Sequence, residues 1–129
     1  MKAQPILVVS GFILFGSAVA ALFAPQEIGI FLSKQDQVAS PLVVQLMGAG
    51  LFALGFLDWL SRFSSIGGIY GRPVVVANFA FFFTATATLV RHALTSKSAG
   101  FAWLLVILAG SFAVWFARFL FFPPKLVAK

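Results

Sequence analysis

The sequence has no cysteine and few acidic residues. Its 129 residues include three aspartate or glutamate residues and one histidine. The absence of cysteine excludes disulfide bonds, thiol redox chemistry, thiolate metal sites and acylation on cysteine. No nucleophile–base pair and no set of metal ligands stands out among the residues that are left. The sequence therefore favours a protein that is not an enzyme, and we expect no metal and no cofactor.

Apolar residues dominate instead, and they form four long runs. Hydrophobic residues make up 61% of the chain, and its mean hydropathy is +1.05. Each run is near the ~20 residues that an α-helix needs to cross a bilayer. The runs are continuously apolar, whereas strands of a membrane barrel would alternate apolar and polar residues. The sequence predicts an all-α integral membrane protein, a four-helix up-down-up-down bundle forming one domain over residues 1–129. The predicted spans are residues 5–24, 41–60, 73–92 and 99–122.

The longest connection, residues 25–40, joins the first two spans. Ile28, Phe31 and Leu32 follow the i, i+3, i+4 spacing of one helix face, with charged residues around them. This pattern predicts a short helix that lies in the membrane interface. The alternative is a lid over a cavity.

Basic residues lie mostly at the ends of the runs. The nine lysine and arginine residues give a net charge of +6. Six of them fall on the side of the N-terminus: Lys2, Arg62, Arg72, Arg118, Lys125 and Lys129. Three fall on the other side: Lys34, Arg91 and Lys97. The positive-inside rule then predicts that both termini are cytoplasmic. We expect membrane lipids, anionic ones above all, as partners and no nucleic acid.

Small residues recur at helical spacing in the runs, and in lipid such stripes let helices approach closely. The stripes are Gly16 and Ala20, Ala49 and Ala53 flanked by Gly48, Gly50 and Gly55, and Ala109, Ala113 and Ala117. Phe79, Phe82 and Phe83 are better suited to face lipid or an oligomer seam. The stripes can pack helices within one chain or join copies in a homo-oligomer or larger membrane complex.

Polar residues cluster near the predicted cytoplasmic face. The cluster consists of Asp58, Arg62, Tyr70, Arg72, Asn78 and Arg118. Asp58 and Arg62 are spaced to pair along a helix. One carboxylate cannot neutralise three guanidinium groups, so these residues together would attract an anion or a lipid headgroup. The alternative is that the arginines extend separately to the headgroups and mark the membrane edge.

The third run ends in a second polar group, which contains the single histidine. His92 is a candidate axial ligand for a haem or pigment, or a proton relay. The alternative is an interfacial histidine without a cofactor, because no second ligand accompanies it. We expect Thr84, Thr86 and Thr88 to hydrogen-bond to carbonyls of their own helix.

One part of the sequence is similar to known membrane proteins. The stretches Gly55–Arg62 and Gly67–Pro73, together with Asn78, resemble small uncharacterised bacterial four-helix membrane proteins. The layout as a whole resembles the DoxX-like group, with a first span that ends in Pro25, a longer outer loop and a glycine-rich second span. This resemblance implies the fold and a bacterial inner membrane, but no activity. DoxX is associated with thiol and sulfur chemistry, which a chain without cysteine cannot share.

Three functions remain open. The first is a non-enzymatic accessory subunit, or a bundle that binds lipid or a small anion. The second is a small oligomeric transporter or channel, with a polar path through Asp58, Asn78, Thr84 and Thr88. The third is a membrane enzyme or a pigment- or haem-binding subunit, which would depend on Asp58, Tyr70 or His92.

Overall fold

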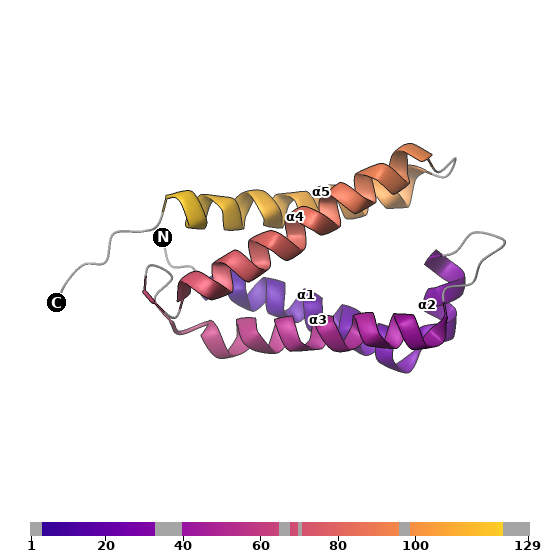
Figure 1. Ribbon diagram of the computed structural model, residues 1–129, viewed down its shortest axis with the longest axis horizontal. Helices are drawn as coiled ribbons and strands as arrows, with labels where there is room; N and C mark the ends of the chain where they lie inside the picture. The colour runs from indigo at the N-terminus through magenta and orange to yellow at the C-terminus, as the bar shows by residue number, and fades with distance from the viewer. Residues whose placement is uncertain (1–3, 33–39, 65–67, 70, 96–98, 123–129) are drawn as a thin grey trace. The chain divides into compact units, whose positions relative to one another are not determined.

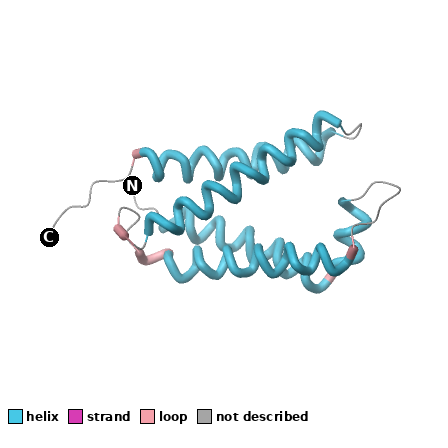
Figure 2. Tube along the Cα trace, in the orientation of Figure 1, coloured by secondary structure: helices cyan, strands magenta, loops and turns pink. Residues whose placement is uncertain are grey.

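The computed structural model describes residues 4–32, 40–64, 68–69, 71–95 and 99–122 (Figures 1 and 2). These residues form the helices α1 (Gln4–Phe23), α2 (Pro25–Leu32), α3 (Pro41–Ser61), α4 (Gly71–Thr95) and α5 (Ala99–Phe121). All except α2 are long and apolar enough to cross a membrane. The prediction of an all-α fold with four long apolar helices is confirmed.

Local signals explain where the helices begin. Ser40 is the N-cap of α3, and Pro41 takes the first helical position, where no N–H donor is needed. Helix α4 begins at Gly71, two residues before the predicted span. The N–H groups of Gly71 and Arg72 both donate to the carbonyl of Gly68, at 3.1 Å, which starts the helix ahead of Pro73. Pro73 fits there because the first turn of a helix leaves its N–H groups without intrahelical partners.

The connection between the first two long helices contains the predicted short helix, α2. The N–H of Ile28 donates to the carbonyl of Ala24 at 3.0 Å, so the turn begins directly where α1 ends. Glu27 lies in the first turn of α2, where a negative charge complements the helix dipole. The rest of the predicted interfacial segment, residues 33–39, lies outside the described residues. Its position at the membrane interface stays a prediction.

The chain divides into two compact units, Lys2–Phe63 and Ser64–Lys129. We call them the N-terminal hairpin, with α1, α2 and α3, and the C-terminal hairpin, with α4 and α5. Within each hairpin the two long helices are antiparallel neighbours, as their contacts below establish.

Two glycines of α3 set the packing of the N-terminal hairpin. A Cβ atom on Gly48 would lie 3.0 Å from the Cβ of Ala21, and one on Gly55 would lie 3.2 Å from the carbonyl oxygen of Gly11. Few Cβ atoms come that close to other atoms, so a larger residue at either position forces its neighbours on α1 to move. The two glycines are seven residues apart, which places them on one helix face in the manner of a coiled-coil seam.

The facing side of α1 carries a matching stripe. Its buried apolar residues are Leu7, Leu14, Ala18 and Ala21. Aromatic rings flank the seam, since Phe15 meets Phe52 edge-on at 5.2 Å and Phe12 meets Trp59 at 5.7 Å. In lipid, where apolar surface alone gives no drive for association, such close packing holds the two helices together.

Part of the small-residue stripes predicted for these two helices lies outside the contact between α1 and α3. Gly16, Ala49 and Ala53 are exposed, and a Cβ atom on Gly16 would meet nothing within 4 Å. Both helices carry small residues on more than one face, and the partner helix decides which face is used. The contact uses Gly48 and Gly55, the glycines that flank the predicted stripe. That an exposed stripe joins copies of the chain stays a prediction.

Aromatic stacking holds the C-terminal hairpin together. Phe82 of α4 lies against two rings of α5, with centroid distances of 4.9 Å to Phe112 and 5.9 Å to Phe116. The planes are nearly parallel, at 19° and 8°. Further along the hairpin, a Cβ atom on Gly110 would lie at an ordinary 3.6 Å from Thr86. Of the stripe predicted for this helix, Ala109 and Ala113 are buried, whereas Ala117 is half-buried.

The prediction that Phe82 faces lipid or an oligomer seam is wrong. Its side chain is only 5% exposed, because it fills the space between α4 and α5. Phe79 is half-buried against Phe121, at 6.4 Å, and Phe83 is exposed and stacks on Phe79 at 5.6 Å. The three residues are equally hydrophobic, so hydrophobicity cannot predict which of them is buried. The position of α5 decides it.

Candidate functional site

The polar cluster predicted from the sequence is divided between the two hairpins. Asp58 and Arg62 belong to α3, Arg72 and Asn78 to α4, and Arg118 to α5. Tyr70 lies outside the described residues. Within each hairpin the arrangement of these residues is defined. The prediction that residues of both hairpins form one site stays a prediction.

Asp58 is buried in the N-terminal hairpin and faces α1. The hydroxyl of Ser10 donates to its carboxylate Oδ2 at 2.6 Å, and both side chains are 0% exposed. The same hydroxyl lies 3.3 Å from the carbonyl of Leu7. The bond connects α1 and α3 and supplies the buried carboxylate with a donor, without which burial of a polar group is costly.

The glycines at the contact between α1 and α3 make room for this hydrogen bond. A Cβ atom on Gly11 would lie 3.5 Å from the Cβ of Asp58, directly beside Ser10. The close approach of α1 and α3 at this point brings the short serine side chain within reach of the carboxylate. Asp58 lies about one turn from the end of α3, so the pair is near one end of the hairpin and not at its middle.

Ser10 is a buried partner of Asp58 that the sequence-based prediction missed. The interpretation sought a partner for Asp58 on its own helix, at Arg62. One signal was available, because Ser10 lies at helical spacing with Leu7 and Leu14 on the buried face of α1. A polar residue on the packing face of a membrane helix calls for a polar partner on the next helix.

Arg62 folds back onto the end of its own helix. Its guanidinium lies 3.9 Å from the ring centroid of Trp59 and 4.3 Å from that of Phe63. Its Nη1 also donates to the carbonyl of Trp59. These contacts place a half-buried cation among aromatic rings, an arrangement found where helices leave the hydrocarbon region. The predicted pairing of Arg62 with Asp58 stays a prediction.

Arg72 and Asn78 lie in the first two turns of α4 and differ in burial. Arg72 is exposed, whereas Asn78 is 0% exposed. Nδ2 of Asn78 donates to the carbonyl of Val74 at 3.1 Å, one turn earlier. Asn78 is therefore part of the packed interior, while the Arg72 guanidinium is accessible from the surroundings.

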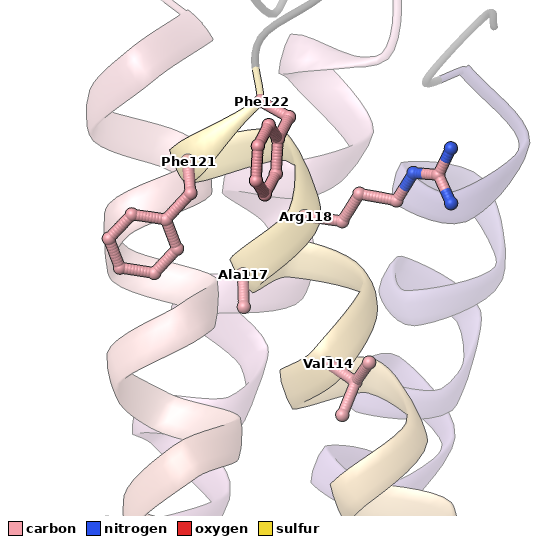
Figure 3. A pocket seen from close by; sticks show the side chains of 5 residues that line it. All are labelled: Val114, Ala117, Arg118, Phe121 and Phe122. Carbon is pink, nitrogen blue, oxygen red and sulfur yellow. The ribbon is translucent and has the colours of Figure 1, made fainter.

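Arg118 borders a cavity of about 500 Å³ near the end of α5 (Figure 3). The cavity is lined by Val114, Ala117, Arg118, Phe121 and Phe122. In Figure 3 the Arg118 side chain extends sideways from the helix, well away from the ring of Phe121. The cavity therefore combines one exposed cation with an apolar wall.

The second polar group lies at the other end of α4, and the role of His92 as an axial ligand or proton relay stays a prediction. His92 is exposed in the last turn of α4. Within the described residues, no three histidine or acidic side chains lie close enough together to hold a metal ion. As predicted, the threonine hydroxyls donate to carbonyls of their own helix, at 2.8 Å for Thr84, 2.6 Å for Thr86 and 2.9 Å for Thr88.

Comparison of the chain with protein-family models, with curated proteins and with solved structures finds no match. The resemblance to DoxX-like proteins and the bacterial inner membrane therefore stay predictions. The four long apolar helices indicate an integral membrane protein on their own.

Proposed function

We propose that this protein is a non-enzymatic membrane bundle that binds phosphate-type anions, as lipid headgroups or as a small ligand, and acts as an accessory subunit. The main observation in support of this proposal is that three arginines lie at helix ends. Arg62 ends α3, Arg72 begins α4, and Arg118 lies in the last turn of α5. If all four long helices cross the membrane in succession, they alternate in direction and these three ends belong to the same membrane face.

The state of Asp58 supports the net positive charge of this face. Among the described residues, Asp58 is the only carboxylate near these helix ends. It is buried and already accepts a hydrogen bond from Ser10. Arg72 and Arg118 are exposed, so their guanidinium forks can meet phosphate oxygens. A basic residue near an anionic surface contributes about 1 kcal/mol, and three together give roughly a hundredfold preference for anionic lipid.

Native mass spectrometry tests the proposal. The protein is extracted gently from its own membrane and compared with the Arg72→Ala/Arg118→Ala double variant. We expect a bound anionic lipid or metabolite on the wild type and its loss from the variant. Both residues are exposed, so the substitutions leave the packing of the hairpins unchanged.

The matched control is Arg91→Ala. Arg91 is an exposed arginine near the other end of α4. The substitution removes one positive charge from the opposite end of α4, and we expect the bound lipid or metabolite to stay on this variant. The same bare mass for wild type and double variant contradicts the proposal and leaves the arginines as simple membrane-edge markers. A second protein that copurifies would support the role as an accessory subunit and identify its partner.

The buried carboxylate of Asp58 favours a second candidate function, a small transporter for protons or cations. An ionisable side chain within a membrane helix is a functional hypothesis by default. Its position near one end of the hairpin argues against a midplane transport site, so this candidate ranks second. Cation flux into liposomes that depends on Asp58 and is lost in Asp58→Asn supports it, and flux equal to that of protein-free liposomes removes it.

A further inference from the structure

The cavity beside Arg118 is a hollow on the last turns of α5, and most of its lining is apolar and outside the polar cluster. The lining residues Val114, Ala117, Arg118, Phe121 and Phe122 are spaced i, i+3, i+4, i+7 and i+8. They therefore form one continuous face of α5. This face is distinct from the buried row of Phe112, Phe116 and Phe119 on the same helix.

Side-chain size explains why the face is hollow. Ala117 lies between the larger Val114 and Phe121, one turn away on either side, and leaves a notch between them. The Phe121 ring is braced by an edge contact with Phe79 of α4, at a centroid distance of 6.4 Å. The apolar wall is thus held in place by the hairpin itself.

The chemistry of the hollow is that of an amphipathic ligand. Four of its five lining residues are apolar, and the fifth, Arg118, is exposed and can fork onto phosphate oxygens. A volume of about 500 Å³ lies within the range of sites that hold small molecules. The C-terminal end of a helix carries about half a negative charge, which the full positive charge of Arg118 exceeds.

The geometry points to a binding site for one anionic phospholipid, with its phosphate on Arg118 and an acyl chain along Val114, Ala117 and Phe121. This inference rests on the proposed function and makes it specific. Charge complementarity selects the ligand, because the chain carries a net charge of +6 and none of the described residues that line the hollow is acidic. A free phosphate would satisfy Arg118 but would leave the apolar wall unfilled.

Fluorescence of Trp115 can report on this site. Trp115 is exposed and lies one turn before Arg118 on the same helix. The full-length chain carries two other tryptophans, which are replaced by the substitutions Trp59→Phe and Trp103→Phe. This protein is placed in phosphatidylcholine vesicles that contain a fixed fraction of brominated phosphatidylglycerol or brominated phosphatidylcholine. Quenching then compares how often each lipid occupies the neighbourhood of Trp115.

We expect about a fivefold preference for phosphatidylglycerol, the factor that one basic residue near the surface provides. Arg118→Ala should lower the preference to about one, and Arg118→Lys should keep part of it because the charge remains. Ala117→Phe fills the notch and should reduce the preference as well. Arg91→Ala and Ala87→Phe, both at exposed positions of α4, are the matched controls and should change nothing.

Three outcomes overturn the inference. The first is equal quenching by both lipids in the wild type, and the second is a preference that survives Arg118→Ala. The third is a preference that inorganic phosphate abolishes, which would identify a site for the free anion. Native mass spectrometry separates these failures from failure of the proposed function. If the wild type carries a bound anionic lipid or metabolite but Trp115 is quenched equally by both lipids, only the site on α5 is ruled out. If the wild type carries no bound anion at all, both the site and the proposed function are ruled out.

Discussion

The two hairpins of this protein bring their helices together with different side chains. The N-terminal hairpin joins α1 and α3 through Gly48, Gly55 and one buried polar bond between Ser10 and Asp58. The C-terminal hairpin joins α4 and α5 through the stack of Phe82 on Phe112 and Phe116. Lipid tails are as apolar as the helices, so neither hairpin gains from the hydrophobic effect that folds soluble proteins. Close backbone contact and ring stacking are two different substitutes for it.

The difference predicts opposite sensitivities. A seam built on glycine fails when side-chain volume is added, whereas a seam built on phenylalanine fails when volume is removed. The following predictions test this contrast, and each free energy of unfolding is measured by reversible unfolding of the full chain in mixed lipid–detergent micelles.

The largest effect is expected for Gly55→Leu. Even a Cβ atom at this position would lie 3.2 Å from the backbone oxygen of Gly11 and from the Cβ of Leu14, so the helices must separate. We expect a loss of about 3 kcal/mol, the upper end for overpacking. Gly50→Leu is the control on the same helix, since a Cβ atom there meets nothing within 4 Å. Similar losses for both variants would mean that α1 and α3 do not meet at this seam.

The second prediction removes volume from the other hairpin. Phe116 is 0% exposed and stacks on Phe82, so Phe116→Ala leaves a cavity between α4 and α5. The cavity contribution for a side chain of this size is about 2 kcal/mol, and in lipid there is no transfer contribution to add. Ile107→Ala, at a position that is 71% exposed, should cost less than about 0.5 kcal/mol. A Phe116→Ala variant as stable as the wild type would contradict the stacking account.

The third prediction concerns the buried polar bond. A double-mutant cycle of Ser10→Ala and Asp58→Asn should give a coupling energy of about 0.6–1.7 kcal/mol, the range for hydrogen bonds between membrane helices. Ser17→Ala is the control, because Ser17 lies exposed on the same helix. Strictly additive effects of the two substitutions would show that Ser10 and Asp58 do not act as a pair.

The smallest effect is expected for Gly110→Ala. The added Cβ atom would meet the Cγ2 of Thr86 at 3.6 Å, an ordinary contact, and alanine favours a helix over glycine by up to about 1 kcal/mol. We expect the stability to stay within about 0.5 kcal/mol of the wild type or to rise. Gly48→Ala, whose Cβ atom would lie 3.0 Å from that of Ala21, should instead lower it. Equal responses at the two glycines would remove the distinction between the hairpins.

The candidate site was predictable in part. Arg62, Arg72 and Arg118 could be placed at helix ends from the sequence, because the ends follow from the lengths of the apolar runs. The spacing of Ser10 with Leu7 and Leu14 is a signal for some polar contact, but neither its pairing with Asp58 nor the hollow beside Arg118 follows from the sequence. The first depends on which face of α1 meets α3, and the second on which side of α5 is left open after Phe112 and Phe116 turn towards α4.

The sequence by itself determined the number, length and apolar character of the long helices. These properties are local, because a backbone in lipid must satisfy its own hydrogen bonds within each segment. Only the tertiary structure decided which face each helix uses: Gly48 and Gly55 rather than Ala49 and Ala53, and Phe82 turned inward rather than outward. The physical reason is that the faces of a membrane helix are alike in hydrophobicity. They differ only in how they fit the neighbouring helix, which no single segment encodes.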